Sequence, residues 1–138
     1  MRFPCEDAKC AWIACTLDSE GTLYLKRNTH NWQVRFEVYN NNLDFLDALQ
    51  ANIGHAKIRR TIYKVKGSPS VKQRYILWIG SQQLLRELLP KILPYLIIKR
   101  KRCELMIEAL KLKEKSGRSS PRLAEIYGLQ GLRKSPSG

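Results

Sequence analysis

The segment from Trp32 to Tyr39 alternates apolar and polar residues, with an apolar side chain at each even position from 32 to 38. A period of two places successive side chains on opposite faces of a β-strand, so the segment predicts a strand with one buried and one polar face. Thr22 to Lys26 shows the same alternation and is joined to this strand by the polar residues 27–31. The two segments therefore predict an antiparallel strand pair. A second pair is predicted over Lys57 to Lys66 and Lys72 to Ile79, joined by a turn at residues 67–70.

Helices are predicted between and after these strand pairs. They cover Ala8 to Leu17 with an end near Asp18 to Gly21, Leu43 to Ile53, a segment that begins after Ser81, and Lys99 to Lys115. Capping residues support these bounds, since Asn40-Asn41-Asn42 precede the second helix, Ser81 precedes the third, and Gly21 and Gly54 follow the first two. We expect Pro90 and Pro94 to interrupt the third helix, because proline lacks the amide proton of a helix interior.

The resulting order, α-ββ-α-ββ-α-α, predicts an α+β fold made of two αββ units. Its antiparallel four-stranded sheet would have helices on one face and polar side chains on the other. We expect residues 1–115 to form this domain. Residues 116–138 are rich in Gly, Ser and Pro and basic, and we expect a partly flexible C-terminal tail with one apolar patch, Leu123 to Leu129.

The charge of the chain is +13 and is unevenly distributed. Residues 1–55 carry five Lys and Arg against seven Asp and Glu, or −2, whereas residues 56–138 carry twenty against five, or +15. Basic charge at this density favours phosphate backbones. A solubilising surface and an anionic membrane partner remain alternatives on charge alone.

The four cysteines and the apolar segments indicate a soluble, intracellular protein. Cys5, Cys10, Cys15 and Cys103 include no C-x2-C pair of the kind that zinc sites prefer, so we expect reduced packing thiols. No apolar run approaches the roughly 20 residues of a membrane span. The first nine residues lack the apolar core of a signal peptide.

Ile13-Ala14-Cys15-Thr16-Leu17-Asp18-Ser19-Glu20-Gly21 resembles, position for position, the LAGLIDADG signature of the homing endonucleases. Two further segments resemble that family in the right order: Asn42 to Ile58, similar to its second helix and the turn that follows, and Leu93 to Glu104, similar to its Pro-Tyr-Leu-x-x-Lys segment. Together they cover roughly residues 10–112. Three ordered segments are more specific than one short motif.

The resemblance implies a single-motif LAGLIDADG homing endonuclease. Such an enzyme has a curved sheet that forms a saddle over the DNA major groove, and it cuts a long, partly palindromic site as a homodimer, leaving short 3′ overhangs. It implies an origin inside an intron or intein, and so an organelle (chloroplast or mitochondrion) or a prokaryotic cytoplasm. Two alternatives on the same scaffold remain open: an intron RNA maturase, and a DNA-binding relative without nuclease activity.

The same resemblance suggests the residues of the site. Glu20, where most relatives have Asp, would be the catalytic carboxylate and bind Mg²⁺ with help from the Ser19 carbonyl. Lys99 would stabilise phosphate charge, unless it is one more member of the solvated basic run at 99–102, and Asn40 would organise water. Ala11, Ala14, Cys15 and Asp18 form a stripe of small residues along one helix face, which we expect to contact a second copy.

Strand alternation supplies the DNA-facing residues. We expect these side chains on the polar face of the sheet: Tyr24, Lys26, Gln33, Arg35, Glu37, Lys57, Arg59, Thr61 and Tyr63. Arg and Gln read guanine and adenine edges in the major groove, and Lys more often holds phosphates. Exposure to solvent alone, with no partner, is the alternative for any one of them.

Overall fold

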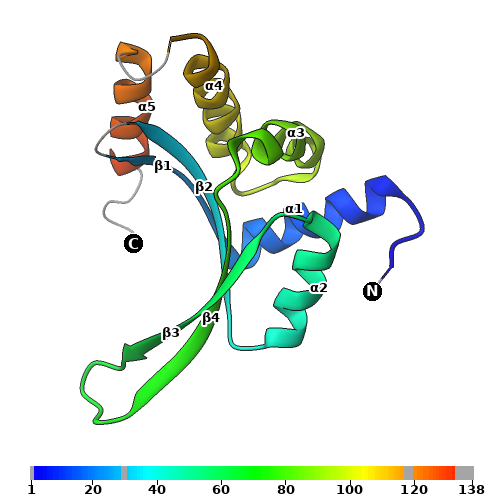
Figure 1. The fold of residues 1–138 in the computed structure, drawn as a ribbon, viewed down its shortest axis with the longest axis vertical. Helices are drawn as coiled ribbons and strands as arrows, with labels where there is room; N and C mark the ends of the chain where they lie inside the picture. Colours follow the sequence, from blue (N-terminus) through cyan, green and yellow to red (C-terminus); the bar gives the residue numbers. More distant parts are fainter. Residues whose placement is uncertain (1, 29–30, 117–119, 133–138) are drawn as a thin grey trace.

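The computed structural model describes residues 2–28, 31–116 and 120–132. Its elements follow the predicted order (Figure 1): α1 (Glu6–Glu20), β1 (Gly21–Arg27), β2 (Trp32–Asn40), α2 (Leu43–Ile53), β3 (Lys57–Lys64), β4 (Val71–Ile79), α3 (Gln82–Ile92), the short 3₁₀ helix η1 (Leu93–Tyr95), α4 (Arg100–Ser116) and α5 (Pro121–Leu132). The predicted α+β class is therefore confirmed. Three predicted caps or stops are also present: Asn42 and Ser81 accept hydrogen bonds from the amides of Phe45 and Leu84, and Gly54 ends α2 with a φ of 103°.

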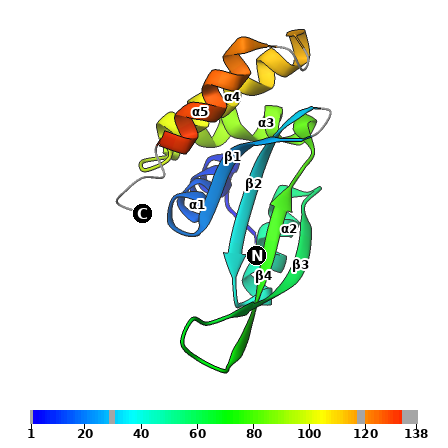
Figure 2. The same cartoon turned by 90° about the vertical axis from the view of Figure 1, so that its left-hand side faces the viewer.

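The four strands form one antiparallel sheet in the order β1-β2-β4-β3. The sheet is curved, with α1 to α4 on one side and an open concave side (Figure 1). Figure 2 shows this open side without a helix across the central strands. Beyond the end of β2, β3 and β4 continue as a hairpin arm.

Strand register brings all nine predicted polar-face residues onto the open side. Tyr24 pairs with Arg35 and Lys26 with Gln33 between β1 and β2. Cross-strand partners share a face of the sheet, and the register continues this face across β4 to β3. It also adds residues outside the prediction: Thr22, Tyr39, Lys72, Arg74, Ile76 and Trp78. The shared face is confirmed, and contact with DNA stays a prediction.

The other face of the sheet builds the core. Leu23 and Leu25 of β1, Phe36 of β2, and Leu77 and Ile79 of β4 are fully buried against the helices. Each such side chain contributes roughly 1.5–3 kcal/mol when it leaves water. The core therefore fixes which strand face is covered and leaves the polar face available.

Several predicted bounds need correction. α1 starts at Glu6 rather than Ala8, whereas its end at Glu20, before Gly21, agrees with the predicted end near residues 18–21. Pro90 lies inside α3 without ending it. The loss is limited to the Pro90 amide, since the apolar side of α3 remains packed in the core. β3 ends at Lys64, two residues earlier than predicted.

Part of the predicted tail is folded. α5 packs its buried Leu123 and Ile126 into the core, and the Trp32 and Tyr127 rings lie 5.5 Å apart. The buried Gln130 amide accepts from the Leu25 N–H at 2.8 Å and donates to the Leu25 carbonyl. Gln130 thus satisfies the outer side of edge strand β1, as a neighbouring strand would. Residues 133–138 lie outside the described residues.

Candidate active site and nucleic-acid interface

Three predicted catalytic residues meet at the C-terminal end of α1, where β1 begins and β2 ends. Glu20 is the last residue of α1 and is exposed. Asn40, the last residue of β2, donates from Nδ2 to Glu20 Oε2 at 2.8 Å. The Asn40 Oδ1 accepts from the Asn42 amide at 2.7 Å, which fixes the orientation of its side chain. The structure thus joins two residues that lie twenty positions apart.

Lys99 reaches the same helix end from the loop before α4. Its ammonium donates to the Asp18 backbone carbonyl at 2.9 Å. Carbonyls in the last turn of a helix lack partners within the helix and carry partial negative charge, which a cation stabilises. Lys99 is therefore separated from the rest of the basic run at 99–102, because its charge is directed to the end of α1.

Asp18 holds this loop in place. Its Oδ2 accepts from the Ile97 amide at 2.7 Å and its Oδ1 from the Lys99 amide at 2.9 Å. Burial would raise the pKa of Asp18, but these amides, that of Ile98 and the Lys99 charge outweigh it, so the pKa lies below its ordinary value. Burial lowers the pKa of Lys99, and the Asp18 charge partly offsets that effect.

Gly21 allows the helix and the sheet to approach closely at this corner. A Cβ at this position would lie 2.8 Å from Leu17 Cδ1, 3.0 Å from Leu17 Cα and 3.1 Å from the Glu37 carbonyl oxygen. The glycine of the signature is thus required by space, since its φ of −112° is accessible to any residue. It keeps Glu20 at the start of the sheet.

The oxygens at this corner suit a hard divalent cation. Glu20 is exposed, and Asn40 bonds only its Oε2. The Ser19 hydroxyl turns back to the Cys15 carbonyl at 2.8 Å, so the backbone carbonyl is the remaining donor of Ser19. Mg²⁺ prefers such carboxylate and carbonyl oxygens. Within the part of the chain that the structure describes, no three His, Cys, Asp or Glu side chains form a metal-binding group.

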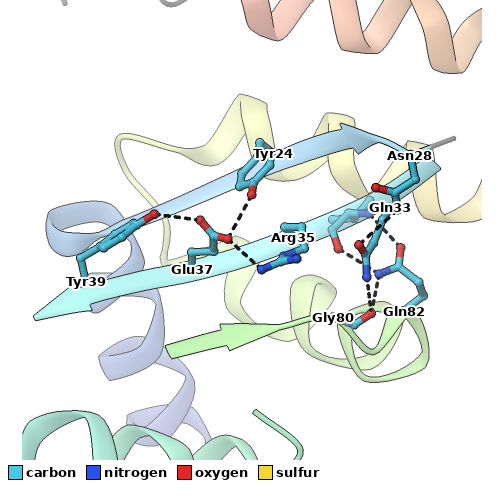
Figure 3. A network of polar contacts seen from close by, with 9 residues as sticks. Tyr24, Asn28, Gln33, Arg35, Glu37, Tyr39, Gly80 and Gln82 are labelled. Carbon is cyan, nitrogen blue, oxygen red and sulfur yellow. Dashed lines mark hydrogen bonds and ion pairs between the residues drawn. The ribbon is translucent and has the colours of Figure 1, made fainter. Parts of the chain in front are cut away.

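The open face carries a polar network centred on Glu37 (Figure 3). Glu37 Oε2 accepts from the Tyr24 hydroxyl and from Arg35 Nη2, both at 3.0 Å, and Oε1 accepts from the Tyr39 hydroxyl at 3.3 Å. Figure 3 also shows Gln33, whose amide donates to the Gly80 carbonyl at 3.2 Å. Several predicted DNA-facing side chains are therefore already oriented by the protein.

Arginine and aromatic side chains alternate across the rest of this face. The Arg35 and Arg59 guanidinium carbons lie 5.8 and 5.4 Å from the centre of the Trp78 ring. The Arg74 guanidinium lies 4.3 Å from the centre of the Tyr39 ring and 4.9 Å from that of Tyr63. Such cation–π contacts hold the guanidinium groups in position while leaving their N–H groups to other partners.

The predicted helix contact for a second copy is only partly at the surface. Ala14 is 0% exposed and belongs to the core of its own chain, so the prediction for Ala14 is wrong. The reason is that α1 turns positions 10, 13, 14 and 17 toward the sheet. Cys15 is exposed, and Ala11 and Asp18 are half-buried. Beside Asp18, Ile97 and Ile98 are 85% and 74% exposed.

Comparison with known proteins places this geometry in a structural class. I-CvuI, a homing endonuclease in complex with its target, matches with a TM-score of 0.71 over 94% of this chain and 84% of its own, at 20% identity. The intron-encoded, DNA-complexed I-CeuI matches with 0.70 over 100% and 72%, at 16% identity. The LAGLIDADG meganuclease I-AabMI, bound to uncleaved DNA, matches with 0.65 over 86% and 42%, at 17% identity. This chain has the LAGLIDADG homing endonuclease fold.

The likeness to this fold is structural. No family model and no curated protein matches the sequence. The α1–β1 corner that the signature-like segment predicts is nevertheless present, with Asp18, Glu20 and Gly21 in three different structural roles. No helix of the described residues is both long and apolar enough to cross a membrane.

Three features of this corner and of the open face lie outside the predictions from sequence. Tyr39 and Trp78 lie on the polar face without having been predicted there, although the alternation of side chains along β2 and β4 indicates that face. The role of Asp18 as the anchor of the 97–99 loop had no local signal, since its partners lie about eighty residues away. Glu37 was predicted at the surface, but it is only 8% exposed.

Proposed function

We propose that this protein is a divalent-metal-dependent homing endonuclease that binds double-stranded DNA on its concave face and hydrolyses both strands. One observation carries the proposal: Glu20 of α1, Asn40 of β2 and Lys99 of the loop before α4 meet at one end of a polar, arginine-bearing sheet. The fold is that of proteins whose structures contain DNA.

In this proposal Glu20 and the Ser19 carbonyl hold Mg²⁺. A bound divalent cation supplies an activated water and stabilises the leaving oxygen. Asn40 keeps the Glu20 carboxylate in one orientation through its 2.8 Å hydrogen bond. Lys99 places a positive charge near the scissile phosphate, where it stabilises the negative charge that develops during cleavage. I-CvuI complexes with DNA were obtained in the presence of Ca or Mg, which supports a divalent cofactor.

We further propose that the active species is a homodimer. One chain supplies one Glu20, whereas cutting two strands needs a carboxylate near each scissile phosphate. The exposed Cys15 side of α1 and the exposed Ile97 and Ile98 form a continuous candidate contact, because Asp18 joins α1 to that loop. The match covers only 42% of I-AabMI, a length that leaves room for a second such unit in one chain. Two-fold symmetry implies a partly palindromic target.

Charge and readout on the concave face fit duplex DNA. Arg35, Arg59 and Arg74 are held against aromatic rings, which suits base recognition in the major groove. The +15 charge of residues 56–138 supplies phosphate contacts. An origin inside an intron or intein, and hence an organelle or a prokaryotic cytoplasm, belongs to the same proposal.

The test uses the DNA that flanks the reading frame, joined without the insertion, because a homing enzyme cuts the site of its own insertion. We expect the wild type to linearise a plasmid carrying this site with Mg²⁺ and to leave it intact with EDTA. Glu20→Gln should abolish cleavage and keep DNA affinity within a few-fold, because it removes the carboxylate that would bind the metal and leaves the strand contacts in place. The exposed Glu104→Gln is the matched control.

A Glu20→Gln protein that cuts at the wild-type rate would contradict the assignment of the site. A wild type that binds this duplex without cutting it under any divalent metal would identify a DNA-binding relative. Binding to the intron transcript in preference to the duplex would identify a maturase.

A further inference from the structure

All the hydrogen bonds in the Glu37 network on the concave face run in one direction, toward the Glu37 carboxylate. Glu37 is 8% exposed although it lies on the open side of β2, because Tyr24 and Tyr39 cover it. Its carboxylate accepts a hydrogen bond from each of the two phenols and forms an ion pair with Arg35 at 3.0 Å. All three partners come from the face on which duplex DNA is proposed to lie (Figure 3).

Each tyrosine hydroxyl has a single proton to donate. Since Tyr24 and Tyr39 donate that proton to Glu37, their oxygens can only accept hydrogen bonds from a ligand. Burial, followed by the charge of Glu37, raises the pKa of Tyr24 to about 12 and also raises the pKa of Tyr39. Both phenols therefore stay protonated near neutral pH and keep donating to Glu37.

A hydroxyl oxygen that can only accept a hydrogen bond favours those groups of DNA that donate one. Phosphate oxygens are acceptors, so a hydroxyl committed to Glu37 offers them no proton. In the major groove, adenine N6 and cytosine N4 carry amino donors, whereas guanine O6 and thymine O4 are acceptors. The complement of these two hydroxyls is thus an amino base, A or C, on the strand they face.

We infer that Tyr24 and Tyr39 select amino bases over keto bases at two nearby positions of each half-site, with Glu37 as the positioning residue that sets this preference. The inference rests on the proposed binding of duplex DNA to the concave face. Both hydroxyls bond one carboxylate, so they lie within about 9 Å of each other, roughly two to three base-pair steps. Tyr39 precedes Asn40, which bonds Glu20, so its base lies nearer the cut.

A specificity role for the Glu37 network and a purely structural role have different measurable consequences. A network that only stabilises the sheet would change stability or overall affinity when it is broken, equally for all sequences. A network that fixes the proton direction of two hydroxyls changes the ratio of affinities for amino and keto bases. The ratio at each position is therefore the decisive measurement.

The experiment selects bound duplexes from a library with randomised sequence, in the presence of Ca²⁺, and then measures affinities for single-position variants of the selected site. For the wild type we expect A or C on one strand at two nearby positions of each half-site. Changing either to G or T should weaken binding about ten-fold or more.

Tyr24→Phe and Tyr39→Phe should each remove the preference at one position and keep it at the other. Glu37→Gln replaces one acceptor oxygen with an NH₂ donor and so frees at least one hydroxyl to donate. The amino-to-keto affinity ratio should therefore fall to about two at one or both positions. Tyr127→Phe, at an exposed position of α5, should leave the ratios unchanged. The phenylalanine variants keep the aromatic ring and are expected to keep the fold. Thermal melts verify that Glu37→Gln is also folded.

Two outcomes separate the inference from the proposed function. A wild type that enriches no sequence overturns both, because the concave face then reads no duplex. A wild type that enriches a site whose amino-to-keto ratios persist in the three network variants overturns the inference alone.

Discussion

Lys99 donates two hydrogen bonds to Asp18, one from its backbone and one from its side chain. The Lys99 amide donates to the Asp18 carboxylate, and the Lys99 ammonium donates to the Asp18 carbonyl, both at 2.9 Å. This pair of residues therefore ties the last turn of α1 to the residue that precedes α4. It also sets where the Lys99 charge lies relative to Glu20, two residues beyond Asp18.

Lys99→Met should slow cleavage about a hundred-fold and change DNA affinity little. Methionine keeps the apolar stem of the side chain but removes the charge that stabilises the reacting phosphate, and losing one such group typically costs this much. Single-turnover cleavage and equilibrium binding are measured together. Lys101→Met, an exposed neighbour, is the control and should weaken binding slightly without changing turnover. If Lys99→Met behaves like Lys101→Met, Lys99 belongs to the basic run.

Cys15→Leu should shift the protein from dimer toward monomer and abolish double-strand cleavage. Cys15 lies on the exposed side of α1, and overpacking a close helix contact costs about 1–3 kcal/mol. Sedimentation should give twice 16.0 kDa for the wild type. The matched control is Ala124→Leu on the exposed side of α5. A wild-type monomer that cuts both strands would refute the dimer.

Gly21→Ala should lower the free energy of unfolding by about 1–3 kcal/mol, because the added methyl overlaps Leu17 and the Glu37 carbonyl. Urea denaturation measures the change. Gly128→Ala in α5 meets no atom within 4 Å and should stabilise by up to about 1 kcal/mol, since alanine is the better helix former. Equal effects of the two substitutions would show that space at Gly21 is not limiting.

Stability should decline in acid through Asp18. Its folded pKa is lowered, so its contribution is complete above the unfolded pKa, about 3.9, and is lost as pH falls from there through the folded pKa. Asp18→Asn should destabilise the protein at pH 7 and reduce the loss of stability below pH 4. Asp47→Asn, at an exposed position of α2, is the control. Thermal melts over a pH series test this, and an unchanged acid slope in Asp18→Asn would contradict it.

Local patterns predicted most of the secondary structure. The period of two in residues 32–39 and the caps at Asn42 and Ser81 act within a few residues, so each can be recognised without the rest of the fold. The predicted bounds of α2 match the structure for the same reason. Pro90 does not end α3, contrary to the local pattern, because packing of α3 in the core outweighs the loss of one hydrogen bond.

The sequence by itself determined the αββαββ order, the polar strand face, and Glu20 and Gly21 at the end of α1, since each follows from periodicity or a short motif. The tertiary structure decided which side of α1 is buried, and so that Ala14 is internal while Cys15 is exposed. It also decided that Asp18 anchors a distant loop, that Glu37 is covered by two tyrosines, and that Gln130 completes edge strand β1. These features depend on contacts between residues far apart in the chain, and local periodicity carries no information about such contacts.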